Sequence, residues 1–161
     1  MRVVVQRVSR SSVSVGGNVL GKIGPGLLVL AAVGEEDTEE DYRFLAKKIV
    51  HLRIFEDDEG KMNRSLLEIS GELLVISQFT LFADCRKGRR PSFLHAASPE
   101  KARKDFVLFL EILKEYPIKV ETGRFGAMMN VELVNDGPVT IIMDSRKMLS
   151  ESRRGNPVNK S

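Results

Sequence analysis

The chain has 161 residues, of which 42% are hydrophobic and 29% charged, values typical of one globular domain. Its one cysteine, Cys85, excludes an intrachain disulfide, and no apolar run reaches the roughly 18 residues that a membrane-spanning helix needs. The net charge is +3, but residues 146–161 carry five basic side chains against one acidic, so residues 1–145 sum to −1. We predict a cytoplasmic protein without membrane association, with one domain over residues 1–145 and a mobile basic tail over residues 146–161.

The predicted elements are short strands interrupted by two helices. Alternating or wholly apolar segments predict strands at residues 1–8, 12–15, 19–23, 27–33, 53–55, 73–78, near 120, 128–134 and 139–143. Thr38, with Asp41 three residues later, begins one helix, and Ser98 followed by Pro99 begins the other, which ends before Pro117. This order indicates an α+β fold, in which a largely antiparallel or mixed sheet forms a barrel-like core with two main helices packed on it.

The side chains that most enzymes use for catalysis are scarce in this sequence. His51 and His95 are the only histidines, and there is no Gly-x-Ser-x-Gly, His-Glu-x-x-His or Walker motif. Cys85 has basic neighbours that favour a thiolate, but the sequence shows no base to pair with it. We therefore expect neither a metal ion nor a cofactor.

Polar and glycine-broken segments at residues 77–80, 88–93, 122–129 and 135–138 are the remaining candidate sites. The first of them ends an apolar strand, and its hydroxyls either bind local backbone or form a site. Taken alone, Asn-Asp-Gly-Pro at residues 135–138 is typical of a hairpin turn. The basic run at residues 86–90 includes Arg89 and Arg90 and follows the polar strand end closely. It therefore offers phosphate-binding charge near that strand end.

Together these segments resemble the D-aminoacyl-tRNA deacylase family, also called the D-tyrosyl-tRNA(Tyr) deacylases. The resemblance runs from Val4 to about Asp144 and is most specific in Ser77-Gln78-Phe79-Thr80 and in Asn135-Asp136-Gly137-Pro138-Val139-Thr140. It implies hydrolysis of the ester that joins a D-amino acid to the terminal adenosine of tRNA, and of glycine mischarged on tRNA(Ala). It also implies a homodimer with two active sites at the subunit interface, to which the 3′ end of an aminoacyl-tRNA binds.

The resemblance further implies roles for individual residues. The catalytic pocket comprises Ser77, Gln78, Phe79 and Thr80, and the substrate-binding residues near it are Phe125 and Met129. A cis Gly137-Pro138 pair, oriented by Arg7, enters the partner subunit's site and crowds the space that an L side chain would occupy. We assign Arg89 and Arg90, from the basic run, to substrate binding.

The scarcity of nucleophilic side chains is compatible with an activated ester as substrate, because hydrolysis of such an ester needs only a modest reduction of the activation barrier. Backbone N–H groups around Phe79 and Thr80 could stabilise the developing oxyanion, and the resemblance adds help from the terminal 2′-OH of the substrate. With no base evident beside it, Thr80 is expected to position the substrate, and a nucleophilic Thr80 is the alternative.

Two other functions are compatible with the sequence. A non-catalytic homodimer that binds tRNA or another nucleic acid would use the basic run and the basic tail, and its binding would not depend on the aminoacyl group. A purely structural homodimer would lack a pocket at the end of the strand before Ser77.

Overall fold

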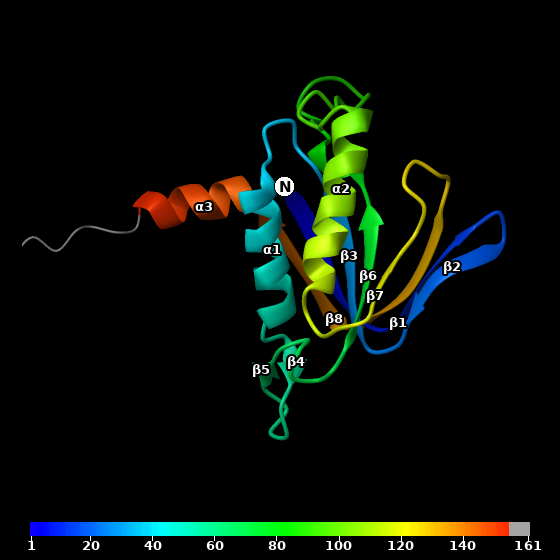
Figure 1. Cartoon of the computed structure of the whole chain (residues 1–161), viewed down its shortest axis with the longest axis vertical. Coiled ribbons are helices and arrows are strands. Elements are labelled where there is room, and N and C mark those ends of the chain that lie inside the picture. Colours follow the sequence, from blue (N-terminus) through cyan, green and yellow to red (C-terminus); the bar gives the residue numbers. More distant parts are fainter. Residues whose placement is uncertain (155–161) are drawn as a thin grey trace, which may run out of the picture.

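The computed structural model describes residues 1–154, with side chains for residues 1–150. Its elements in chain order are β1 (Arg2–Val15), β2 (Asn18–Ile23), β3 (Gly26–Ala32), α1 (Glu39–His51), β4 (Phe55–Glu56), β5 (Met62–Arg64), β6 (Glu72–Ser77), the 3₁₀ helix η1 (Phe79–Phe82), α2 (Pro99–Lys114), β7 (Val120–Thr122), β8 (Asn130–Asp144) and α3 (Ser145–Arg154). Figure 1 shows α1 and α2 side by side across one face of the main sheet. The predicted α+β class is confirmed.

The main sheet is mixed and nearly closed. Its order is β2-β1-β3-β6-β7, with β8 paired to β1 as well. Strands β3, β6 and β7 are parallel to one another, whereas β1 is antiparallel to β2, β3 and β8. At Gly21 of β2 an added Cβ would lie 3.0 Å from the backbone oxygen of Thr122 in β7, so the two edges approach closely and the sheet curves into a barrel-like shape.

Apolar side chains pack on both faces of this sheet. Leu27, Leu73 and Phe109 belong to the larger cluster, which lies between the sheet and the helices. The next residues along two of these strands, Leu28 and Leu74, belong to a smaller cluster on the opposite face, inside the curve of the sheet. This alternation follows the two-residue period of a strand, and it explains why β3 and β6 are apolar throughout.

The two predicted helices begin at the predicted residues. The backbone N–H of Thr38 donates to the Asp41 carboxylate at 2.9 Å before α1, and the N–H of Lys101 donates to the Ser98 hydroxyl at 3.4 Å at the start of α2. The helices are joined by the Tyr42 hydroxyl, which donates to an Asp105 carboxylate oxygen at 2.7 Å.

Residues 135–138 do not form the hairpin turn that their composition alone predicts. Strand β8 continues through them, because Asn135 pairs with Val8 and Thr140 pairs with Gln6 on the same antiparallel partner. The four residues between Asn135 and Thr140 therefore bulge out of a single strand. The side-chain oxygen of Asn135 closes the bulge by accepting from the backbone N–H of Val139 at 3.0 Å.

The segment expected to be a tail begins as helix α3, which the sequence did not predict. Ser145 is fully buried at its start, and Arg146 pairs with Glu36 at 2.6 Å and with Asp37 at 3.2 Å. From there α3 extends away from the sheet (Figure 1). Residues 155–161 of the expected tail lie outside the described residues. No helix in the described part of the chain is long and apolar enough to cross a membrane.

Candidate active site

The polar strand end at residues 77–80 lies where the buried strand β6 reaches the surface. Ser77 is the last residue of β6 and pairs with Ala31, and the N–H of Gln78 still donates to the Ala31 carbonyl at 2.8 Å. The chain then turns into η1, and the side-chain amide of Gln78 donates to the hydroxyl of Thr80. The two side chains are therefore held together at the carboxyl end of a central strand.

Two backbone donors in this turn have no acceptor among the described residues. The first N–H groups of a helical turn lack intrahelical partners. Within residues 1–154, no other backbone oxygen accepts from the N–H of Phe79 or of Thr80. In contrast, the N–H of Leu81 donates to the Gln78 carbonyl at 3.2 Å. Two adjacent free N–H groups at an exposed turn can bind an oxyanion.

The basic loop folds back beside η1. Asp84 and Ser92 exchange two backbone hydrogen bonds, of 2.7 and 3.0 Å, which bring Phe93 against Phe79 in an edge-to-face contact of 5.1 Å between ring centroids. Arg86 binds Asp84 at 2.6 Å, and this contact holds the pKa of the Asp84 carboxyl well below its usual range. Arg89 and Arg90 are exposed on the same loop. The base of the loop that carries the two arginines thus lies beside η1.

Met129 and Phe125 lie on different sides of the sheet. A Cβ added to Gly123 would be 2.5 Å from the Met129 sulfur and 3.5 Å from Ile76, so Met129 packs beside the residue that precedes Ser77. Phe125 lies toward α2, with its ring 6.0 Å from that of Phe106 and 5.1 Å from the Arg103 guanidinium. Met129 is therefore close to the end of β6, whereas Phe125 is part of the packing around α2.

The Gly137-Pro138 pair lies in the bulge of β8 and is tied to Arg7. Arg7 is buried, and its Nε donates to the Asp136 carbonyl at 2.9 Å while Nη1 donates to the Ile54 carbonyl at 2.7 Å. Gly137 has a φ of +130°, and a Cβ there would be 3.0 Å from Nη2 of Arg7. The peptide bond between Gly137 and Pro138 is cis, and both residues are exposed.

The structure does not bring this pair together with η1 in one chain. Strand β1 touches both places, since Arg2 donates to the Leu81 carbonyl at 2.7 Å and Arg7 contacts Asp136. Five residues of extended strand separate Arg2 from Arg7, a distance of about 16 Å. The two parts of the predicted site are therefore separated along β1, with η1 at its first residues and the Gly137-Pro138 pair beside its middle.

Two grooves border η1. One of about 510 Å³ runs from Leu81 along Arg2 and Ile142 to Met148 in α3. The other, of about 1030 Å³, lies between Phe82, the basic loop and the first turn of α3. The contact of Arg2 with η1 could not be expected from the sequence, because the partners of Arg2 are distant in the chain.

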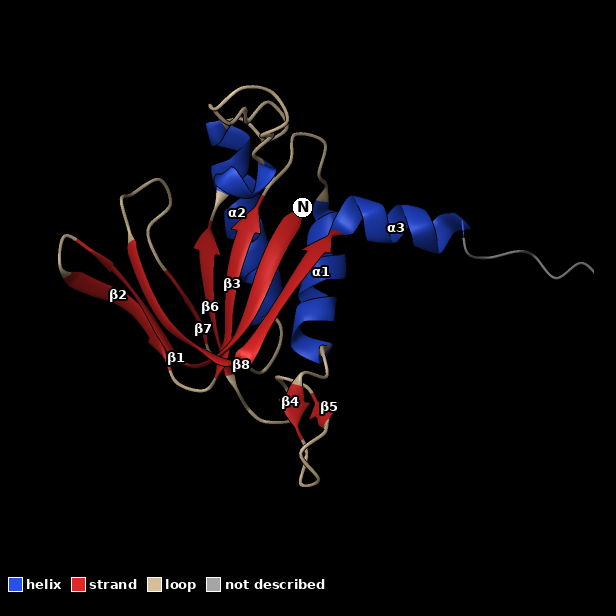
Figure 2. Cartoon of the chain, turned by 180° about the vertical axis from the view of Figure 1, so that it is seen from behind, coloured by secondary structure: helices blue, strands red, loops and turns tan. Residues whose placement is uncertain are grey.

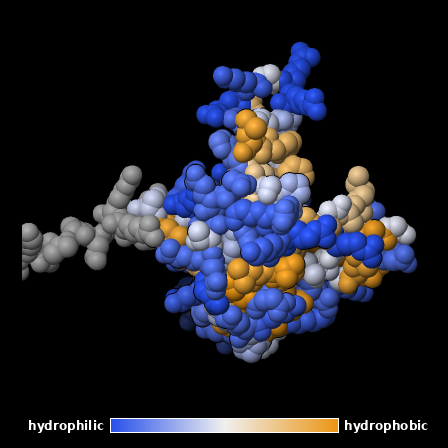
Figure 3. All heavy atoms as spheres, turned by 45° about the horizontal axis from the view of Figure 1, so that its top comes forward, coloured by the Kyte–Doolittle hydropathy of each residue, from blue (hydrophilic) through white to orange (hydrophobic). Residues whose placement is uncertain are grey.

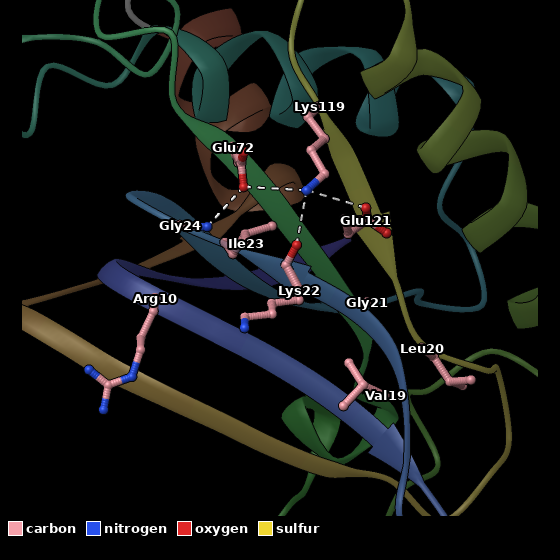
Figure 4. Close-up of a pocket in the computed structure, with 10 residues that line it drawn as sticks. All are labelled: Arg10, Val19, Leu20, Gly21, Lys22, Ile23, Gly24, Glu72, Lys119 and Glu121. Atoms are coloured by element: carbon pink, nitrogen blue, oxygen red, sulfur yellow. Dashed lines mark hydrogen bonds and ion pairs between the residues drawn. The ribbon is translucent and has the colours of Figure 1, made fainter.

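A third groove, drawn in Figure 4, lies at the opposite end of β6 from η1. There Glu72 accepts from the N–H of Gly24 at 2.8 Å, and the Lys119 ammonium binds Glu121 at 3.5 Å and the carbonyl of Lys22 at 3.1 Å. None of the predicted site residues lines it, and its polar groups join β2 to β6 and β7 (Figure 4). These contacts close the barrel.

Comparisons with known proteins agree with this architecture. The sequence model of the D-Tyr-tRNA(Tyr) deacylase family matches residues 4–144. The D-aminoacyl-tRNA deacylase of Thermosipho melanesiensis is 60% identical over 149 residues, which cover 92% of this chain and 99% of that protein. The D-aminoacyl-tRNA deacylase of Clostridium botulinum is 58% identical over 147 residues, covering 91% and 99%.

Two solved structures are also similar. The c-Myc DNA unwinding element binding protein has 43% identity and a TM-score of 0.85 and covers 89% of this chain and 98% of its own. A probable eukaryotic D-amino acid tRNA deacylase has a TM-score of 0.76 at 18% identity, covering 88% and 97%, and shows the fold alone. The fold and these relatives define a hydrolase of the aminoacyl-tRNA deacylase class. The chain belongs to the D-Tyr-tRNA(Tyr) deacylase family, and the resemblance found in its sequence is confirmed.

Proposed function

We propose that this protein hydrolyses the ester between a D-amino acid and the terminal adenosine of tRNA, releasing both, and that it treats glycine mischarged on tRNA(Ala) in the same way. Membership of the family supports the reaction class. The structural observation that carries the proposal is the pair of free backbone N–H groups of Phe79 and Thr80 at an exposed turn, beside the Gln78 and Thr80 side chains.

In the proposed reaction, water attacks the ester carbonyl carbon, and the carbonyl oxygen becomes an oxyanion that accepts from the N–H groups of Phe79 and Thr80. The bond to the ribose oxygen then breaks, and the ribose takes up the proton that the water gave up. The neighbouring 2′-OH of the substrate orients or activates the water. Ser77, Gln78, Phe79 and Thr80 form the catalytic set.

We assign Thr80 a positioning role. Its hydroxyl accepts from the Gln78 amide, and none of the hydrogen bonds found among the described residues joins it to a His, Asp or Glu side chain. A hydroxyl without a general base is a weak nucleophile at neutral pH. An aminoacyl ester does not need a strong one, because the substrate is already activated.

Gly137-Pro138 is the proposed filter against L-amino acids. The pair is exposed, and Arg7 fixes the backbone just before it. A glycine exposes its backbone without a side chain, so it can come close to the α-carbon of a bound substrate. Crowding on one side of that carbon rejects an L side chain and leaves room for a D side chain or for glycine.

This filter requires a second subunit. Because η1 contacts the first residues of β1 and Gly137 lies beside its middle, the two are apart in one chain, so the pair of one subunit would enter the site of another, which supports the proposed homodimer. Figure 2 shows that no helix in the described part of the chain covers the face of β1, β3 and β8 opposite α1 and α2. Ile142 is 71% exposed there.

On another face, drawn in Figure 3, charged and polar residues predominate and hydrophobic residues form separate patches between them.

The remaining predicted residues bind the substrate in this proposal. Arg89 and Arg90 contact phosphates near the 3′ end of the tRNA in this proposal, because they are exposed cations on the loop whose base packs beside η1. Met129 borders the end of β6, whereas Phe125 packs against Phe106 of α2 on the other side of the sheet. Cytoplasmic tRNA is the substrate pool that this function requires.

The test is the release of D-tyrosine from D-tyrosyl-tRNA by purified protein, with L-tyrosyl-tRNA as the matched control. We expect turnover of the D substrate and of glycyl-tRNA(Ala), and almost none of the L substrate. Light scattering of the same sample should give the mass of a dimer. A dimer that binds tRNA but leaves the ester intact would instead support the non-catalytic nucleic-acid-binding function.

A further inference from the structure

Core packing does not hold η1 in place. None of its four residues is buried, and Phe79 is 55% exposed. Its entrance is fixed by the hydrogen bond from the Gln78 N–H to the Ala31 carbonyl at 2.8 Å, which belongs to the sheet. A short 3₁₀ turn with little burial has low local stability, so its far end needs another attachment.

Arg2 provides that attachment. From β1 its Nη1 donates to the carbonyl oxygen of Leu81 at 2.7 Å, and its guanidinium carbon lies 4.8 Å from the centre of the Phe82 ring. The opposite edge of the same guanidinium binds one oxygen of Asp144, at 3.2 Å from Nε and 3.1 Å from Nη2. Arg2 therefore links the end of η1 to the end of β8.

The chemistry of arginine suits this link. A guanidinium carries five N–H donors in one rigid plane, so it can bind a carbonyl on one edge and a carboxylate on the other while stacking on an aromatic ring. The side chain of Arg2 is 32% exposed and that of Asp144 is 15% exposed, so solvent screens the ion pair only in part. A lysine could reach one of these partners but could not hold all three.

We propose that Arg2 is a positioning residue for the hydrolysis, which fixes η1 so that the N–H groups of Phe79 and Thr80 stay aimed at the oxyanion. The inference rests on the proposed function. The N–H of Leu81 already binds the Gln78 carbonyl, so holding the Leu81 carbonyl fixes the whole turn from its far end. A misplacement of about 1 Å in such donors can cost about 100-fold in rate.

The experiment compares Arg2→Met and Arg2→Lys with the wild-type protein on D-tyrosyl-tRNA. We expect kcat to fall about 10- to 100-fold for Arg2→Met and less for Arg2→Lys, with KM changed less than about threefold. Asp144→Asn should also lower kcat. In the double variant its effect should not add to that of Arg2→Met, because both substitutions break the same link between η1 and β8.

Arg43→Met is the matched control. Arg43 is a half-exposed arginine that binds Glu39 at 2.7 Å and Glu115 at 3.1 Å, far along α1 from η1. It should leave kcat unchanged and should shift Tm by about as much as Arg2→Met does. If Arg2→Met unfolds the protein, Arg2→Lys, which keeps the charge and most of the stem, carries the comparison.

A second readout does not depend on activity. Amide hydrogen exchange should accelerate about tenfold or more in Arg2→Met at Leu81 and Ala83, whose N–H groups are hydrogen-bonded to the carbonyls of Gln78 and Thr80, and stay unchanged in Arg43→Met. A wild-type kcat in Arg2→Met, or unchanged exchange at η1, would overturn the inference. A wild-type protein that fails to release D-tyrosine while exchange at η1 responds to Arg2→Met would overturn the proposed function instead.

Discussion

The buried guanidinium of Arg7 binds the carbonyl oxygen of Asp136 at 2.9 Å, one residue before the Gly137-Pro138 pair. Its Nη1 donates to the carbonyl oxygen of Ile54, just before β4, at 2.7 Å. The bulge of β8 is thus fastened to a second part of the chain through one rigid planar group. Such a fastening suits the proposed role of this exposed pair, which is to meet a second subunit in a defined orientation.

Arg7→Lys should weaken the discrimination between D and L substrates. A lysine ammonium can bind one of the two carbonyls but not hold both in the geometry of the guanidinium fork. Losing a hydrogen bond of a charged group, at about 1.5–3 kcal/mol, corresponds to about a 10-fold or larger fall in the ratio of kcat/KM for D- over L-tyrosyl-tRNA. Arg10→Lys, at an exposed position of the same strand, is the control. An unchanged ratio in Arg7→Lys would contradict the role.

Gly137→Ala should weaken the discrimination between D and L substrates or abolish activity. At a φ of +130° an L side chain is strained, and the added Cβ would meet Nη2 of Arg7 at 3.0 Å and Cγ2 of Val139 at 2.8 Å. We expect the D over L ratio of kcat/KM to fall at least about 10-fold, or turnover to vanish in a folded dimer. Gly17→Ala, at a φ of +82° with open space around it, controls for backbone strain alone. Equal discrimination in the wild type and Gly137→Ala would remove the pair from the filter.

The elements that the sequence predicted correctly are those fixed by local interactions. Helices α1 and α2 begin directly after the cap residues Thr38 and Ser98, because a cap interacts with a residue only three positions away. The composition of Asn-Asp-Gly-Pro predicts a hairpin where β8 has a bulge. These residues are typical of a turn both when the chain reverses and when one strand continues past them. Pairing with Gln6 and Val8, more than a hundred residues earlier, decides the outcome. Helix α3 likewise begins at Ser145, whose hydroxyl donates to Asp41, 104 residues away.

The residues of the candidate site also divide into those that local sequence reveals and those that only distant contacts reveal. Residues 77–80 could be found because polar side chains end an apolar strand, and the basic loop could be placed beside them because it follows directly. The contact of Arg2 with η1 could not be found, since Leu81 and Asp144 lie 79 and 142 residues further along. That Gly137-Pro138 lies away from η1 in the same chain also became visible only through the register of β1 with β8.

Thr80→Ala should retain substantial activity. Thr80 accepts a hydrogen bond from Gln78, and its loss removes a positioning contact but leaves the backbone N–H donors in place. We expect kcat on D-tyrosyl-tRNA to fall less than about 10-fold, the range for one neutral hydrogen bond. Complete loss of turnover, with a wild-type Tm and dimer mass, would restore the alternative in which Thr80 is the nucleophile.

Ser145→Ala should destabilise the protein near neutral pH and less so in acid. Burial acts to raise the pKa of the Asp41 carboxyl, but hydrogen bonds from Ser145 and from the Thr38 backbone outweigh it and hold the pKa below its ordinary value. A lowered carboxyl pKa stabilises the folded state above the unfolded pKa, and this contribution is lost as the pH falls through the folded pKa.

We therefore expect Ser145→Ala to lower the free energy of unfolding by about 2 kcal/mol at pH 7, measured by urea denaturation. The difference from the wild type should shrink as the pH falls below about 4, because Asp41 takes up a proton first in the unfolded state and, at lower pH, in the folded state as well. A part should persist, because the Met1 ammonium group also donates to the Ser145 hydroxyl, at 2.7 Å. Ser150→Ala, at an exposed hydroxyl, should have almost no effect. A difference that is independent of pH would show that Asp41 does not mediate it.

Removing residues 151–161 should weaken tRNA binding in a salt-dependent way. This segment carries Arg153, Arg154 and Lys160 against Glu151, whereas a cut before Arg146 would also remove the ion pairs of that residue with Glu36 and Asp37. If these three cations contact phosphates, the slope of log K for tRNA binding against the logarithm of the salt concentration should become shallower by about two. Replacing the three with glutamine in the full chain separates charge from length and should give the same slope. Hydrolysis of a short D-tyrosyl-CCA fragment should not change, since it lacks the acceptor stem. A slope equal to that of the wild type would exclude the segment from tRNA binding.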